Sequence, residues 1–157
     1  MQRNQNSKKT TDHKLKTKNC RVALVVSEYN SDITFPMRDG AIQELKFHGI
    51  KETNIVVVNA PGAFEIPLLC QRFAKTKKYK GIIAIGCVIK GDTDHYYQIS
   101  NESTRGIMDV MLKFDLPITN AILTVNNLEQ AKIRSTGASN KGIEAAIALL
   151  KIFNYLN

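Results

Sequence analysis

The chain has 157 residues, of which 43% are hydrophobic and 23% charged, a composition typical of a single globular domain. Its formal net charge is +8, but residues 1–21 carry seven basic residues against one acid, whereas the rest carries 15 basic residues and 13 acids. This near balance in the body argues against a nucleic-acid-binding domain, and no apolar run approaches the roughly 18 residues of a membrane span.

Residues 1–20 are polar and basic, with Leu15 as the only large apolar residue between Met1 and Cys20. Such a segment buries too little surface to order itself, so we expect a flexible basic tail over 1–20 and one folded domain over 21–157. No apolar stretch follows the first charges, as it would in a secretory signal. The cysteines at 20, 70 and 87 are odd in number and widely spaced, which predicts free thiols in a cytoplasmic protein.

Short apolar runs then alternate with helical patterns. The runs predict strands over 22–26, 55–58, 81–89 and 117–125. Met37, Ala41 and Leu45 recur at helical spacing, with Pro36 expected in the first turn and Gly49 at the end of this helix. Further helices are expected over about 66–76, 95–113, 128–134 and 140–153.

Strands that alternate with helices of this length imply parallel crossovers, so we predict an α/β protein, a three-layer α/β/α sandwich around a four-stranded parallel sheet. In such sheets ligands bind beyond the carboxyl ends of the strands. This rule indicates four loops as candidates for a site: 27–32, 59–65, 87–95 and 124–127.

The loop 87–95 carries the most chemistry. Gly91 lets the backbone approach a ligand, and Thr93 precedes a helix whose free N–H groups and positive dipole end suit a phosphate. The alternative is that Thr93 or Asp94 simply caps this helix. His95 is placed to transfer protons near neutral pH, although a surface histidine is the plainer interpretation. We give His13 and His48 no role.

The other loops leave two interpretations open. Phe64 and Glu65, after the turn at Pro61 and Gly62, either serve the core and the helix dipole or border a heterocycle read by the backbone. Tyr29 offers a ring for stacking, and Asn30 either binds a ligand or caps a turn. Arg134 and Lys141 are either anion partners or solvated charges. We find no metal-ligand cluster, P-loop or nucleophile elbow, so we expect acid–base chemistry and phosphate handling without a metal.

At this point the residues match a known family. The strings GAFEIP at 62–67 and GxVIxGxTxH at 86–95 are specific, and they occur together with Glu28-Tyr29-Asn30, Leu123-Thr124, Glu129-Gln130-Ala131 and Asn140-Lys141-Gly142 in family order. The chain closely resembles the 6,7-dimethyl-8-ribityllumazine synthases over residues 21 to 153. The resemblance implies a flavodoxin-like fold and the penultimate step of riboflavin biosynthesis, with no cofactor.

The family condenses 5-amino-6-(D-ribitylamino)uracil with 3,4-dihydroxy-2-butanone 4-phosphate, releasing phosphate and water. The resemblance makes His95 the proton-transfer residue and Tyr29 the ring that stacks on the pyrimidine. It assigns the phosphate to Asp92, Thr93 and Arg134. The remaining substrate-binding residues that it implies are Asn30, Ala63, Phe64, Glu65, Cys87, Val88, Ile89, Asn120 and Lys141.

Two positions depart from the family pattern. Asn120 stands where the family commonly has an aromatic side chain, which a neighbouring subunit contributes to the pocket. The loop between Arg134 and Asn140 is one residue shorter and lacks its usual lysine. Family members form pentamers with sites between subunits, so we expect a homopentamer or a multiple of it, small-molecule substrates, and neither a nucleic-acid nor a membrane partner.

Two alternatives from other classes remain. One is a non-catalytic flavin-binding or assembly relative, which the residue at 120 and the short loop would favour. The other is nucleic-acid binding through the basic segment 1–21.

Overall fold

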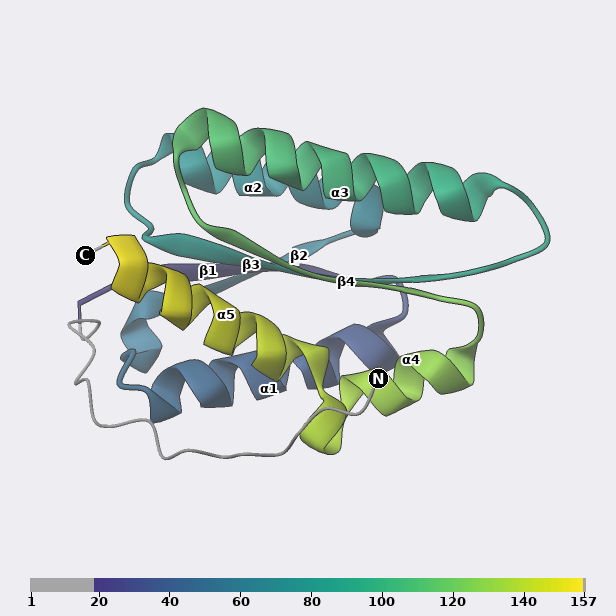
Figure 1. Cartoon of the computed structure of the whole chain (residues 1–157), viewed down its shortest axis with the longest axis horizontal. Helices are drawn as coiled ribbons and strands as arrows, with labels where there is room; N and C mark the ends of the chain where they lie inside the picture. The colour runs from purple at the N-terminus through teal and green to yellow at the C-terminus, as the bar shows by residue number, and fades with distance from the viewer. Residues whose placement is uncertain (1–18, 157) are drawn as a thin grey trace.

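A computed structural model describes residues 19–156 of the chain (Figure 1). The expected flexible tail over 1–20 therefore lies outside the described residues, except for its last two positions. Of these, Cys20 is half-buried and packs against the core of the domain. None of the helices within 19–156 is long and apolar enough to cross a bilayer.

Four parallel strands form one sheet in the order β2-β1-β3-β4. The strands are β1 (Val22–Ser27), β2 (Ile55–Ala60), β3 (Gly81–Ile89) and β4 (Ile118–Val125). The helices are α1 (Ser31–Phe47), α2 (Ile66–Lys75), α3 (His95–Phe114), α4 (Leu128–Ser135) and α5 (Lys141–Leu156). Helices α2 and α3 cover one face and α1, α4 and α5 the other (Figure 1). The predicted three-layer α/β/α sandwich is confirmed.

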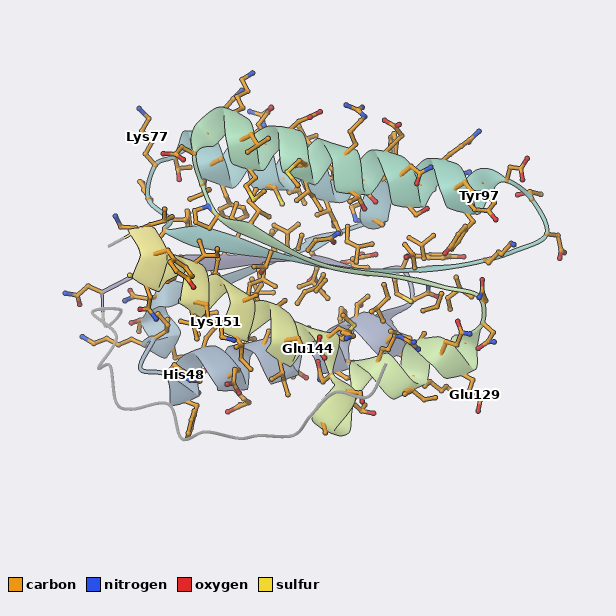
Figure 2. The ribbon with its side chains drawn as sticks, in the orientation of Figure 1. His48, Lys77, Tyr97, Glu129, Glu144 and Lys151 are labelled. Atoms are coloured by element: carbon orange, nitrogen blue, oxygen red, sulfur yellow. The ribbon has the colours of Figure 1, made fainter. Side chains whose placement is uncertain are left out.

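The strands divide their side chains between two cores, which fill the space on either side of the sheet (Figure 2). All six residues of β1 are buried, and successive side chains alternate between the layers. Leu24 packs with α1 and α5, whereas Val25 packs with α2 and α3. A strand covered on both faces needs no polar positions, which explains the continuous apolar run in the sequence.

Helix α1 begins earlier than predicted. It starts at Ser31, so Pro36 lies within the helix and not in its first turn. The turn before it is compact because Asn30 adopts a left-handed conformation with φ 59° and the Thr34 hydroxyl donates to the Ser27 carbonyl at 2.6 Å. The expected polar loop over 27–32 is therefore two residues shorter, because Ser31 and Asp32 belong to the helix.

Helix α5 crosses α1 at very close range. A Cβ on Gly142 would collide with the carbonyl of Met37, so the two backbones touch directly at this point. The buried side chain of Asn140 holds the crossing together: its Nδ2 donates to the Pro36 carbonyl at 3.2 Å, while its Oδ1 accepts from the Gly142 N–H at 2.8 Å. This contact fixes where the loop between α4 and α5 sits on the sheet.

Candidate active site at the carboxyl edge of the sheet

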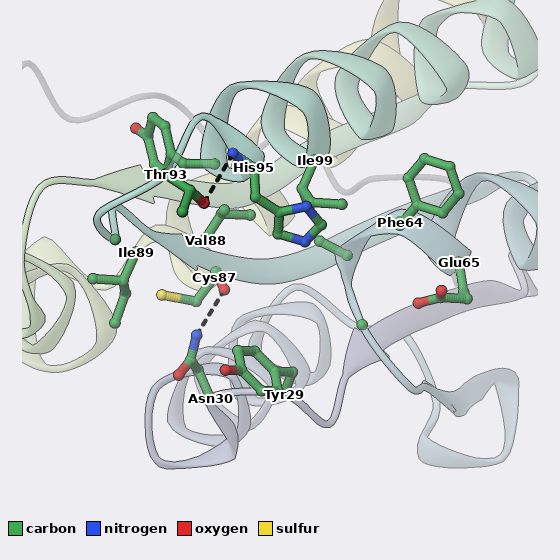
Figure 3. A pocket seen from close by; sticks show the side chains of 14 residues that line it. Tyr29, Asn30, Phe64, Glu65, Cys87, Val88, Ile89, Thr93, His95 and Ile99 are labelled. Carbon is green, nitrogen blue, oxygen red and sulfur yellow. Dashed lines mark hydrogen bonds between the residues drawn. The ribbon is translucent and has the colours of Figure 1, made fainter.

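A cavity of about 440 Å³ lies beyond the carboxyl ends of β1, β2 and β3 (Figure 3). Three of the four loops that the strand-end rule indicated contribute to it. The cavity is lined by Tyr29, Asn30, Gly62, Ala63, Phe64, Glu65, Cys87, Val88, Ile89, Gly91, Thr93, His95, Tyr96 and Ile99.

Asn30 ties two sides of this cavity together. Its Nδ2 donates to the carbonyl of Cys87 at 2.9 Å, which joins the loop after β1 to the end of the adjacent strand β3 (Figure 3). The side chain does not cap α1, although Asn30 is the residue before its first turn. An asparagine suits this place because it tolerates the left-handed backbone and has an amide long enough to reach the next strand.

Two aromatic rings stand at the rim. Tyr29 is 72% exposed and Phe64 is 57% exposed, and neither ring belongs to a core cluster. The interpretation of Phe64 as a core residue is therefore wrong. Phe64 and Glu65 lie in a short 3₁₀ turn over Ala63–Glu65, immediately before α2, and Glu65 folds back over Gly62. Exposed rings at the mouth of a cavity provide flat surfaces for a planar ligand.

His95 is the first residue of α3, and its ring projects into the cavity (Figure 3). Its backbone N–H donates to the Thr93 hydroxyl at 3.4 Å, a long hydrogen bond that supports the interpretation of Thr93 as a cap. The Thr93 O–H can still donate to a ligand. Asp94 precedes the helix but makes no side-chain cap, and Asp92 does not line the cavity.

Cys87 contributes an apolar wall. It is almost fully buried, and this burial raises the pKa of its thiol to about 11. Burial likewise raises the pKa of Cys70, inside the core between the sheet and α2, to about 12. A thiol needs to ionise to act as a nucleophile, so Cys87 lines the cavity as a protonated group. All three cysteines are free, as predicted.

Asn120, Arg134 and Lys141 line a different cavity, of about 470 Å³, between edge strand β4 and helices α4 and α5. Within one chain, Arg134 and Thr93 therefore line different cavities. The Arg134 Nη1 donates to the Gln130 carbonyl at 3.0 Å, and the Lys141 Nζ pairs with a Glu144 oxygen at 2.7 Å. We call this the β4 cavity.

Asn120 has a clear local role on this edge strand. Its Oδ1 accepts from the N–H of Ile122 at 2.9 Å, so the side chain satisfies a backbone donor that no neighbouring strand takes up. An aromatic side chain at the same position has no acceptor for this N–H. The departure from the family pattern thus changes the chemistry of the strand edge as well as the wall of the cavity.

Sequence reasoning missed two residues of the first cavity, Tyr96 and Ile99. Ile99 stands four residues after His95 on α3, so helical spacing alone places the two side chains on one face. Tyr96 packs edge-on against Tyr97 with ring centroids 5.1 Å apart, a contact that the sequence did not indicate. Among residues 19–156, no group of three or more His, Cys, Asp or Glu side chains is arranged to hold a metal ion.

A parallel α/β/α sandwich with a ring-edged cavity at its strand ends, and one histidine directed into it, is typical of proteins that bind or transform small molecules. Comparison with known proteins gives the particular family. A sequence model of 6,7-dimethyl-8-ribityllumazine synthase matches residues 19–157. The chain is also 44% identical over 137 residues to the 6,7-dimethyl-8-ribityllumazine synthase of Leuconostoc mesenteroides, an alignment that covers 87% of this chain and 88% of the relative.

The chain therefore belongs to the 6,7-dimethyl-8-ribityllumazine synthase family and is an enzyme of riboflavin biosynthesis, a transferase that forms the lumazine. The resemblance seen in the sequence motifs is confirmed, together with the activity that it implied.

Proposed function

We propose that the 440 Å³ cavity is the place where the ribitylaminouracil and the ketose phosphate condense, with His95 as the proton-transfer residue. The observation that carries this proposal is that His95 projects between the Phe64 and Tyr29 sides of one cavity (Figure 3). The uracil ring would stack on Tyr29, and backbone groups around Ala63, Val88 and Ile89 would bind its polar edge and the ribityl chain. No cofactor takes part in this reaction.

Each step of the condensation moves a proton. The 5-amino group attacks the ketone, and a first water leaves to give an imine. Elimination of phosphate then creates a new carbonyl, and the ribitylamino nitrogen closes the ring on it with loss of a second water. His95 is suited to this sequence because an imidazole both accepts and returns a proton near neutral pH. Glu65 also lines the cavity, on the same side as Phe64 (Figure 3), and would bind the polar edge of the pyrimidine.

Phosphate binding points to a second copy of the chain. The lining of the first cavity contains no lysine or arginine, whereas the β4 cavity contains Arg134 and Lys141 but no histidine. Thr93 and the first turn of α3 offer donors to a phosphate, but a dianion at this place also needs cations. We propose that Arg134, Lys141 and Asn120 of one copy complete the cavity of the next, in a homopentamer or a multiple of it.

The test of the proposed site is lumazine formation by the purified full-length protein, followed by fluorescence against a protein-free control. We expect a saturable acceleration that riboflavin, a planar relative of the product, inhibits competitively. A rate equal to the control from folded, oligomeric protein, combined with tight riboflavin binding, would instead support the flavin-binding relative.

We also propose a cytoplasmic location, in keeping with the three free thiols.

A further inference from the structure

The basic residues of the body gather at the amino edge of the sheet, opposite the candidate active site. The loops that lead into the strands carry Arg21, Lys51, Lys77, Lys78 and Lys80. The last turns of α1, α2 and α3 add Lys46, Arg72, Lys75 and Lys113. We call these nine residues the amino-edge surface. Lys77 lies at this end of the molecule, whereas Glu129 and Tyr97 lie at the other (Figure 2).

The near balance of charge in the body therefore conceals a strong asymmetry. The acids within the amino-edge region are Glu44, Glu52 and Asp115. One of them is already paired with a cation, since a Glu52 oxygen lies 3.1 Å from the Lys46 Nζ, and a Glu44 oxygen lies 3.4 Å from the His48 Nδ1. At the opposite edge the loops and first helical turns after the strands hold six acids and one lysine, namely Glu28, Asp32, Glu65, Asp92, Asp94, Glu129 and Lys90, and the last turn of α4 and first turn of α5 add Lys132, Arg134, Lys141 and Glu144.

Helix dipoles explain only part of this arrangement. Helices α1, α2, α3 and α5 all end at the amino edge, and each helix end contributes about half a negative charge, or about two in all. The nine cations outnumber the three acids and the helix-end charges combined. Lys51, Lys75, Lys77, Lys78 and Lys80 are moreover exposed, so the excess positive charge faces solvent.

The most basic part of this surface is held in one conformation. The Thr76 hydroxyl donates to the Phe73 carbonyl at 2.7 Å, and Lys77 adopts a left-handed backbone with φ 55°. Lys80 N–H donates to the Arg21 carbonyl at 2.8 Å, which joins the loop before β3 to the one before β1. The Arg21 guanidinium in turn lies 5.2 Å from the ring centre of Tyr79.

A cavity of about 410 Å³ opens beside these lysines. Lys77, Tyr79 and Lys80 line it on one side. Phe114, Leu116 and Pro117 form an apolar wall on the other, with one acid, Asp115, among them. Cations next to a cavity with apolar and aromatic walls suit a ligand that combines phosphates with unstacked planar rings.

We propose that the amino-edge surface binds single-stranded nucleic acid without regard to sequence, with phosphates on Arg21, Lys77, Lys78 and Lys80 and an unpaired base in the 410 Å³ cavity. Among residues 19–156, the α-helices reach this surface only with their C-termini, so it presents no recognition helix to a groove and binds the backbone. The expectation of no nucleic-acid partner rested on the overall charge of the body, which does not describe this edge. The 18 residues before Asn19 carry six further bases and, after Met1, a single large apolar residue, which suits a polyanion in water more than a bilayer.

The test uses two variants of the full-length assembled protein with identical net charge. One carries Lys77→Gln, Lys78→Gln and Lys80→Gln, and the other carries Lys14→Gln, Lys16→Gln and Lys18→Gln. Affinity is measured by fluorescence anisotropy with a labelled oligouridylate of about 20 nucleotides, over a series of salt concentrations. Unchanged lumazine formation by the first variant shows that it is folded, since none of its three lysines belongs to the proposed active site.

We expect the 77/78/80 variant to bind at least tenfold more weakly than wild type at about 50 mM salt, and to lose about two units from the slope of log affinity against log salt. The 14/16/18 variant should lose clearly less, and duplex RNA of equal length should bind more weakly than the single strand. Equal losses in the two variants, a loss confined to the 14/16/18 variant, or no binding by wild type would each overturn the proposal. So would equal affinity for the duplex, or retention on phosphatidylserine vesicles without retention of the oligonucleotide.

Discussion

His95 is the residue on which the proposed chemistry depends. His95→Ala should slow lumazine formation by roughly ten- to ten-thousandfold, the range expected when a general acid–base group is lost. The assay is steady-state lumazine formation with both substrates, and gel filtration checks that the oligomer is intact. His48→Ala is the matched control, because His48 lies at the end of α1, far from the cavity along the strands, and should keep wild-type activity. A His95→Ala rate within twofold of wild type would remove His95 from the mechanism.

Cys70 and Cys87 make stability depend on alkaline pH. Burial raises their pKa values in the folded protein to about 12 and about 11, above the 9.0 of a free thiol. The folded state therefore holds these protons more tightly than the unfolded state, and the stabilisation is complete below about pH 9 and lost as pH rises towards 11 and 12. Urea unfolding at pH 8 and pH 10 should show a fall in stability.

The contribution of each thiol to this fall is at most about 1.4 kcal/mol per pH unit. In Cys70→Ala the drop between pH 8 and pH 10 should be smaller by about 1.4 kcal/mol in total, because the unfolded thiol begins to ionise only near pH 9; the variant is less stable at both pH values. Cys20, which is half-buried and whose thiol faces the positive charge of Lys80, should contribute less. An identical drop in Cys70→Ala and wild type would show that this thiol does not titrate with unfolding.

At the same scale, the sequence located most of the first cavity. Tyr29, Phe64, Thr93 and His95 were found because polar or aromatic residues after buried strands meet at one edge of a parallel sheet. The hydrogen bond from Asn30 to the Cys87 carbonyl was beyond sequence reasoning, since it joins residues 57 positions apart and depends on how β1 pairs with β3. The hydrogen bond that the Ile122 N–H donates to the Asn120 side chain likewise depends on β4 being an edge strand.

Among the elements, the crossing of α1 and α5 is the least tolerant of added volume. Gly142→Ala places a methyl group against the Met37 carbonyl, and backbone cannot move aside as a flexible side chain would. We expect a loss of about 1–3 kcal/mol of stability, as for overpacked cores, measured by urea unfolding. Gly91→Ala is the control, because its Cβ would meet nothing within 4 Å. Equal stability of Gly142→Ala and wild type would mean that the two helices move apart freely.

The secondary structure was largely predictable because both of its signals are local. Continuous apolar runs correspond to strands buried on both faces, and the spacing of Met37, Ala41 and Leu45 corresponds to the buried stripe of α1. The start of α1 was missed although Ile33 extends the same stripe by one turn. Pro36 was taken as a sign of the first turn, yet it lies inside the helix. Its carbonyl accepts a hydrogen bond from the Asn140 side chain, a contact from a distant loop that the local sequence does not indicate.

For the whole molecule, the division of residues between two cavities makes a prediction about mixed oligomers. His95→Ala and Arg134→Ala subunits, refolded together, should regain about a quarter of wild-type activity, because one ordered pair of neighbours in four then supplies an intact His95 and an intact Arg134. The assay is run at a low concentration of the ketose phosphate, where Arg134→Ala alone should be weakest. Each variant refolded alone is the control. No gain on mixing would place both residues in the site of one subunit.

The side chain of Asn120 also has a consequence for how the sheet can grow. Open sheet edges attract further strands, which makes them both assembly sites and starting points for aggregation. Because Asn120 occupies the outward N–H of Ile122, an incoming strand finds one of its hydrogen-bond partners on β4 already taken. The β4 edge therefore offers an incoming strand one free N–H fewer, so strand addition at β4 is weakened by that hydrogen bond.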